Sequence, residues 1–176
     1  MAAKKPFQTN FLGEGATAED GPKPREIYEK GRFGELVNGK FKYSLAETLY
    51  LLENKKIEVI EKNNSLSTNE FLNKARRVDK NFWTKYVVFS NLRSKGYIVK
   101  TALKFGADFR VYDKDVQPGE DHAKWIVFPV HESKTLTWHD FSAKNRVSHS
   151  TRKNLLIGVV DDEDDVTYYE IAWKKP

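Results

Sequence analysis

Because the sequence contains no cysteine, a metal would have to be held by nitrogen and oxygen ligands, such as histidine and carboxylate side chains. That absence excludes disulfide frameworks, zinc sites built on thiolates and cysteine nucleophiles. The histidines show no close metal-ligand spacing. Three aspartates could converge at strand ends around Mg²⁺, but turn capping and surface charge explain them better. We therefore predict no bound metal and no cofactor; the residues considered are His122, His131, His139, His149, Asp108, Asp113 and Asp115.

Cleavage of RNA without a metal is an alternative chemistry, in which the substrate's own 2′-hydroxyl attacks the adjacent phosphorus. It needs a base near that hydroxyl, an acid near the leaving 5′-oxygen and a cation beside the phosphate. Histidine suits the acid, and tyrosine can act as the base where nearby cations favour its phenolate. Tyr112, His122 and Lys153 have the required types. By themselves they fit a strand tyrosine, a loop histidine and a solvated lysine at a helix end better than a catalytic set, so composition alone does not select them.

The composition is that of a globular protein with a basic surface. The chain has 176 residues, 39% hydrophobic and 31% charged, with a formal net charge of +5. This charge favours a polyanionic partner such as nucleic acid. No apolar run approaches the ~20 residues that a membrane span needs, and the first residues lack the apolar centre of a signal peptide. We expect a cytoplasmic protein without membrane association.

The elements that must position these residues form two patterns, and the first predicts an α+β domain over residues 1–81. Residues 1–25 show no sustained period and are expected to be a loose leader or an edge segment. A tight hairpin turn, an alternating strand and two capping boxes that open helices follow. These signals lie at Asn38-Gly39, residues 57–60, Ser44 to Glu47 and Ser67 to Glu70.

The second pattern, over residues 82–176, begins with an aromatic helical stripe and continues mainly as strands. The stripe ends at Gly96, which suits a helix C-terminus, and we place the boundary near Asn81. A helix starting at Thr137 and running toward Lys153 would form one basic face. The expected strands cover 97–103, 109–112, 125–130, 155–160 and 166–173.

Three motifs in this second half resemble those of the archaeal tRNA-splicing endonucleases, the tRNA-intron endonuclease family. They occur in the family's order, and the similarity reaches back through two N-terminal segments, so it covers most of the chain beyond the leader. The segments are Gly96-Tyr-Ile-Val-Lys-Thr-Ala-Leu-Lys-Phe-Gly-Ala-Asp-Phe-Arg-Val-Tyr112, Asp121-His122-Ala-Lys-Trp, Arg146-Val-Ser-His-Ser-Thr-Arg-Lys153, Phe33-Gly-Glu-Leu-Val-Asn-Gly-Lys and Ser44-Leu-Ala-Glu-Thr-Leu-Tyr.

This resemblance implies an α+β N-terminal domain followed by a nuclease-like α/β C-terminal domain with a central mixed sheet. It implies a catalytic subunit in which Tyr112 is the general base, His122 the general acid and Lys153 the stabiliser of charge on the phosphorane. The substrate would be precursor tRNA with a bulge-helix-bulge motif, and the products a 2′,3′-cyclic phosphate and a 5′-hydroxyl. Arg146 and Trp173 would hold a flipped-out base between planar faces.

An acidic run in the last part of the chain fits the same resemblance. An acidic loop repels RNA, but inserted into a basic pocket of another subunit it would join two dimers into a tetramer. The resemblance thus implies a homotetramer, with a heterotetramer containing a non-catalytic subunit as the alternative. A solvated hairpin tip is the plainer explanation of such a run. Its members are Asp161, Asp162, Glu163, Asp164 and Asp165.

Two other functions compete with this one. A non-catalytic RNA-binding or scaffold subunit of the same complex would lack one of the three candidate catalytic side chains, and none is missing here. A metal-dependent DNA nuclease also competes, because a fold does not by itself fix the chemistry. Sensitivity to EDTA separates that function from metal-free cleavage.

Overall fold

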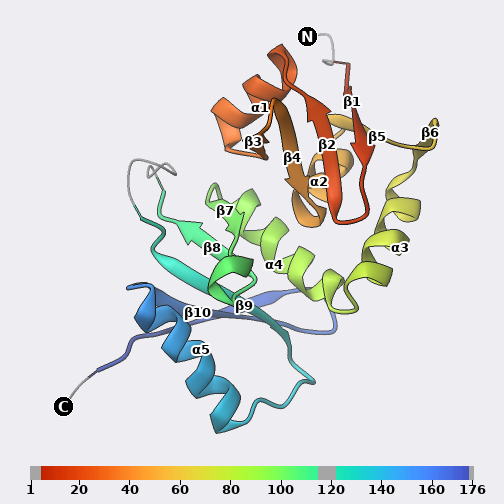
Figure 1. Cartoon of the computed structure of the whole chain (residues 1–176). Coiled ribbons are helices and arrows are strands. Elements are labelled where there is room, and N and C mark those ends of the chain that lie inside the picture. Colours follow the sequence, from red (N-terminus) through yellow and green to blue (C-terminus); the bar gives the residue numbers. More distant parts are fainter. Residues whose placement is uncertain (1–4, 115–121, 175–176) are drawn as a thin grey trace. The chain divides into compact units, whose positions relative to one another are not determined.

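The computed structural model describes residues 5–114 and 122–174 of the chain (Figure 1). The chain falls into two compact units, residues 1–83 and 84–176. No helix within the described ranges is long and apolar enough to cross a membrane. Each unit is built around its own mixed sheet. This confirms the predicted α+β N-terminal domain and the predicted central mixed sheet of the C-terminal domain.

The N-terminal unit contains a six-stranded sheet with the order β3-β4-β2-β1-β5-β6. Strands β1 and β5 pair in parallel, and every other neighbouring pair in this sheet is antiparallel. The elements are β1 (Phe7–Phe11), β2 (Gly15–Glu19), α1 (Pro22–Gly31), β3 (Glu35–Val37), β4 (Lys40–Ser44), α2 (Leu45–Glu53), β5 (Ile57–Glu61), β6 (Asn64–Leu66) and α3 (Thr68–Val78).

Local sequence signals account for the turn and the helix starts of this unit. Asn38 and Gly39 have φ of 52° and 76°, as a primed hairpin turn between β3 and β4 requires. Ser44 caps α2 and Ser67 caps α3, each in a reciprocal capping box with the glutamate three residues later. These predictions are confirmed.

The expectation of a loose leader or an edge segment in residues 1–25 is wrong for β1 and β2. Strand β1 lies inside the sheet, where Phe7 to Asn10 pair in parallel with residues 57–60, and β2 pairs with both β1 and β4. Each strand is only five residues long, too short to show a clear period. These residues form strands because their backbones pair with segments far along the chain, and the local sequence does not reveal that pairing.

The C-terminal unit carries a five-stranded sheet with the order β11-β10-β9-β8-β7, in which only β9 and β10 are parallel. A parallel pair needs a crossover, and α5 supplies it. The elements are α4 (Phe82–Ser94), β7 (Ile98–Thr101), the short 3₁₀ helix η1 (Leu103–Phe105), β8 (Phe109–Tyr112), β9 (Trp125–His131), α5 (Trp138–Ser150), β10 (Asn154–Val160) and β11 (Val166–Ile171).

Helices α4 and α5 cover opposite faces of this sheet (Figure 1). Ile126 and Ile157 belong to the cluster against which Phe141 and Val147 of α5 pack. The next residue of β10, Gly158, points the other way, and a Cβ there would lie 3.0 Å from the Val88 side chain of α4. The sheet therefore presents two distinct surfaces, and the residues on the α5 side can be identified from strand register.

Candidate functional site

The three chain segments that carry Tyr112, His122 and Lys153 meet at the backbone of Lys124. The Lys124 N–H donates to the Val111 carbonyl (2.9 Å), one residue before Tyr112. The Lys124 carbonyl accepts from the Asn154 N–H (3.0 Å), one residue after Lys153. Lys124 itself follows His122 by two residues. Backbone pairing at the ends of β8, β9 and β10 thus brings the three candidates to one corner of the sheet.

Tyr112 and Arg110 lie on the face of the sheet that α5 covers. Arg110 is directly opposite Ile126 across the β8–β9 pair, and directly opposite residues share a face. Ile126 belongs to the cluster beneath α5, and residues two apart in a strand point the same way. Tyr112 is 5% exposed, so packing holds its ring in place.

Lys153 lies beyond the end of α5. The expectation that the helix runs toward Lys153 and carries it on one basic face is therefore wrong. The helix ends at Ser150, and Arg152 adopts a left-handed conformation with φ of 55°. The Lys153 Nζ donates to the Thr151 carbonyl (3.0 Å). Burial, and secondarily the nearby Arg110 charge, lower the pKa of Lys153 below the ordinary lysine value. Lys153 and Arg110 are thus close enough to interact electrostatically.

Two basic residues on this face were not singled out from the sequence. Arg110 is one, and Lys100 is the other, since it is directly opposite Arg110 in the β7–β8 pair and only 5% exposed. A signal for Arg110 was available, because it precedes Tyr112 by two residues in a strand. Lys100 could be placed there only with the register of β7 against β8.

An ion pair joins Asp113, the residue after Tyr112, to Lys124, which follows His122 by two residues. The Lys124 Nζ lies 2.9 Å from an Asp113 carboxylate oxygen, and the Lys124 ammonium lies 4.5 Å from the centre of the Trp125 ring. The hydrogen bond from Lys124 holds the pKa of Asp113 below its ordinary value. His122 itself is exposed. The pair thus joins the segment that carries the tyrosine to the segment that carries the histidine.

The aspartates weighed as magnesium ligands have other partners. Asp113 pairs with Lys124, and Asp108 pairs with Lys85 of α4 (2.8 Å). Asp115 lies outside the described residues. Within residues 5–114 and 122–174, no three His, Asp or Glu side chains are grouped so that they could hold a metal ion. The prediction that no metal takes part stays a prediction.

Arg146 and Trp173 line one hollow of about 710 Å³ between α5 and the segment after β11. Trp173 is 61% exposed, and its ring meets the His149 ring edge-on at 4.8 Å between centres. Arg146 is also exposed. The sequence prediction placed these two planar groups near each other, and the structure puts His149 beside them as a further planar group.

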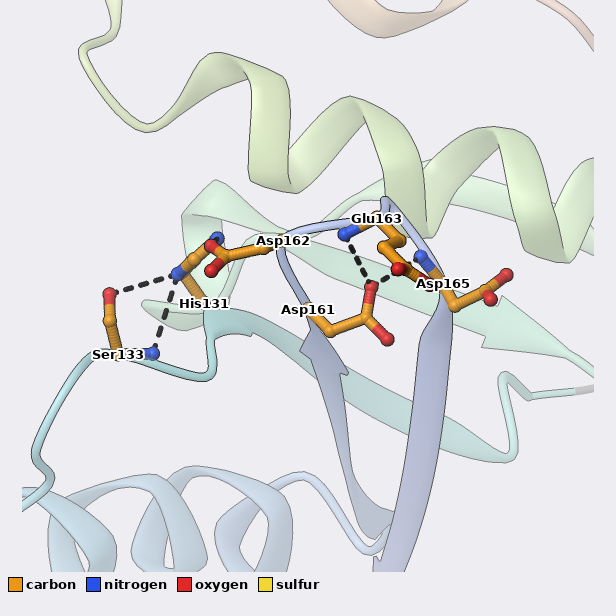
Figure 2. A network of polar contacts seen from close by, with 6 residues as sticks. All are labelled: His131, Ser133, Asp161, Asp162, Glu163 and Asp165. Atoms are coloured by element: carbon orange, nitrogen blue, oxygen red, sulfur yellow. Dashed lines mark hydrogen bonds and ion pairs between the residues drawn. The ribbon is translucent and has the colours of Figure 1, made fainter.

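The acidic run forms the tight turn between β10 and β11 (Figure 2). One carboxylate oxygen of Asp161 accepts from the backbone N–H groups of Glu163 and Asp165, both at 2.9 Å. Asp161 is therefore a structural residue that orders the turn. The other four acidic residues, Asp162 to Asp165, are exposed.

His131 connects this acidic turn to the end of β9 (Figure 2). Its Nδ1 lies 2.9 Å from the Ser133 hydroxyl and accepts from the Ser133 N–H (3.4 Å). In the neutral ring the proton then resides on Nε2, which lies 3.5 Å from an Asp162 carboxylate oxygen. Asp161 thus orders the turn through hydrogen bonds to its backbone, and His131 contacts the turn through Asp162.

Two family models match the chain, one in each unit. Residues 7–72 match the N-terminal domain of tRNA intron endonucleases, and residues 82–168 match their catalytic C-terminal domain. A tRNA-splicing endonuclease of Thermococcus onnurineus is 40% identical over 172 residues, covering 98% of this chain and 99% of the relative.

Other archaeal relatives with the same name give comparable matches. The protein of Nanoarchaeum equitans is 46% identical over 138 residues, covering 75% of this chain and 88% of its own length. That of Methanothermobacter thermautotrophicus is 36% identical over 152 residues, covering 86% of this chain and 88% of its own length. The similarity thus extends across both domains.

Proposed function

Because the chain belongs to the tRNA intron endonuclease family, we propose that it is a metal-independent endoribonuclease of tRNA splicing. It cleaves precursor tRNA at bulge-helix-bulge splice sites through attack by the substrate's 2′-hydroxyl, and it leaves 2′,3′-cyclic phosphate and 5′-hydroxyl ends. The observation that carries this proposal is the 40% identity to a tRNA-splicing endonuclease over nearly the full length of both chains.

Tyr112, His122 and Lys153 carry the chemistry in this proposal. Tyr112 removes the proton from the 2′-hydroxyl, His122 gives a proton to the leaving 5′-oxygen, and Lys153 stabilises charge on the phosphorane. The meeting of their three segments at Lys124 supports this assignment. The Arg110 charge acts on Lys153, and Arg110 lies on the face that carries Tyr112, so positive charge is available beside the tyrosine to stabilise the phosphorane.

Arg146 and Trp173 bind a flipped-out base of the bulge between their planar faces. Their shared hollow and the exposure of both side chains support this role. Stacking of a base on an aromatic ring tolerates any base, because every base has a π-face. This contact selects the shape of the bulge and leaves its sequence free.

Assembly completes the proposed enzyme. The acidic turn of one subunit enters a basic pocket of another, giving a homotetramer, or alternatively a heterotetramer with a non-catalytic subunit. The ordering of this turn by Asp161 supports the insertion, because a pre-formed turn loses less conformational entropy on docking. We further propose that the domains extend over residues 1–81 and 82–176 and that the enzyme works in the cytoplasm.

One experiment tests the proposed function. The purified chain alone is incubated with an intron-containing precursor tRNA in EDTA, the product ends are identified, and the oligomer mass is measured by light scattering. We expect cleavage to cyclic phosphate ends by a tetramer. Cleavage that stops in EDTA and returns with Mg²⁺ would identify a metal-dependent nuclease. No cleavage by the chain alone would identify a subunit that needs a second, different chain.

A further inference from the structure

A hollow of about 520 Å³ in the N-terminal unit belongs to none of the sites described above. Ligand pockets occupy about 300–1,000 Å³, so its size suits a small molecule or one unit of a polymer. It lies where α1, the end of α2 and the starts of β1 and β5 come together, all within one compact unit. These elements are labelled in Figure 1.

The wall of this hollow is aromatic and apolar. The rings of Phe33 and Tyr50 stack at 5.6 Å between centres with 19° between their planes. Phe7 and Ile27 are half-buried beside them, and Leu51 is 2% exposed. A flat apolar group gains both burial and ring stacking against such a wall.

The rim of the hollow is basic. Four exposed lysines line it, namely Lys5, Lys23, Lys30 and Lys56. Among the described residues one carboxylate lines it, that of Glu26, which lies 2.7 Å from the Lys30 Nζ. The Lys23 Nζ donates to the Lys5 carbonyl (2.9 Å), which draws two of the lysines together. The hollow therefore combines a planar apolar wall with an excess of positive charge.

From this combination we propose that the hollow binds one nucleotide of single-stranded RNA, with the base against Phe33 and Tyr50 and the phosphate at Lys23 and Lys56. A nucleotide offers the planar and the anionic group that the wall and the rim each require. The acidic turn of another copy satisfies the charge alone, since Asp161 to Asp165 include no aromatic side chain. This inference rests on the proposed function, so the RNA is precursor tRNA, bound here at a position outside its splice site.

A binding measurement in the full chain tests the hollow directly. Trp173→Ala serves as the background, because it disables the proposed base clamp of Arg146 and Trp173 as a competing site. Fluorescence anisotropy follows a labelled six-nucleotide RNA whose 2′-hydroxyls are methylated, so that it is not cleaved. The test variant is Lys23→Glu with Lys56→Glu. The matched control is Lys42→Glu with Lys80→Glu, two exposed lysines of the same unit that lie outside the hollow.

We expect the test variant to raise the Kd about tenfold or more, and the control to change it about twofold or less. The slope of log Kd against log salt should fall by about 1.4 in the test variant, since each lost phosphate contact to a single strand contributes about 0.7. Equal effects of the two variants would overturn the proposal. Thermal unfolding by circular dichroism establishes that both variants are folded.

Two further arms separate the possible occupants. AMP should bind more weakly than the six-nucleotide RNA; tighter binding of AMP would make the hollow a site for a free nucleotide and overturn the proposal. A loss of tetramer in the test variant alone, with RNA binding unchanged, would assign the hollow to the acidic turn of another copy, which also overturns it.

Cleavage of precursor tRNA distinguishes failure of this inference from failure of the proposed function. With the clamp intact, the test variant should raise KM and leave kcat unchanged. If the original chain cleaves and the test and control variants have equal KM, the inference fails while the function stands. If the original chain cleaves no precursor tRNA, the proposed function fails, and anisotropy still decides whether the hollow binds RNA.

Discussion

The proposed catalytic corner, with Tyr112, His122 and Lys153, and the proposed base clamp, with Arg146 and Trp173, belong to the same domain but differ in exposure. At the corner Tyr112 is 5% exposed and Lys153 is partly buried near Arg110, while His122 is exposed. In the clamp Trp173 is 61% exposed, and Arg146 and His149 are also exposed. Partial burial brings charges into a medium where they affect each other's proton affinity, whereas exposed planar groups keep their surfaces available for a ligand. The corner is thus suited to chemistry and the clamp to binding.

Removing the Tyr112 hydroxyl is expected to give the largest effect and to fall on kcat. Tyr112→Phe should lose most of the ~10²–10⁴-fold that general base catalysis supplies, with binding retained. A precursor with 2′-deoxy nucleotides at the cut sites should bind normally and remain uncut. Single-turnover cleavage and filter binding measure the two properties. Tyr169→Phe, an exposed tyrosine of β11, is the matched control. Cleavage of the deoxy substrate would remove the roles of Tyr112, His122 and Lys153 together.

Removing the Trp173 ring should weaken binding of the substrate more than the chemical step. Trp173→Ala should weaken binding of precursor tRNA by about 1–3 kcal/mol, the contribution of one stacked base, with a smaller change in the rate of the bound complex. Trp138→Ala removes another exposed tryptophan, 82% exposed at the start of α5, and should leave binding unchanged. If Trp173→Ala lowers only kcat, the division between chemistry and binding is wrong.

Neutralising the acidic turn should affect cleavage less and assembly more. The triple variant Asp162→Asn, Glu163→Gln and Asp165→Asn removes three charges and keeps Asp161, whose carboxylate orders the turn. Light scattering should then show dimers in place of tetramers, with weaker cutting. The triple variant Glu14→Gln, Glu19→Gln and Glu29→Gln removes the same charge from exposed positions elsewhere. A tetramer that survives in the first variant would exclude the turn from assembly.

The smallest expected effect concerns the proton affinity of Lys153. Burial and Arg110 lower the pKa of Lys153 in the folded chain, so Arg110→Gln should raise it toward the ordinary value. Between the lowered and the ordinary pKa the unfolded chain binds more protons, so this lysine makes stability rise with pH in that window. An NMR titration of the Lys153 side chain measures the shift. Arg146→Gln is the control, and an equal shift in both variants would contradict the coupling.

Local signals allowed much of the fold to be predicted. The capping boxes at Ser44 and Ser67 form as expected, and so do the helix start at Thr137 and the Asn38-Gly39 turn. Each depends on residues no more than three positions apart, so neighbouring sequence contains the whole interaction. The loose leader was a wrong prediction for the opposite reason, because β1 is ordered by residues 57–60, about fifty positions away.

The sequence by itself determined the residue types, their order in three motifs and the elements that carry them. The tertiary structure decided which of these residues share a surface. Lys124 joins the three segments through its backbone, and the register of β7, β8 and β9 puts Lys100, Arg110 and Tyr112 on the face beneath α5. A shift of one residue in that register would turn the side chains to the other face. Register is set by pairing between segments distant in the chain, so only the folded sheet fixes which charges lie beside the tyrosine.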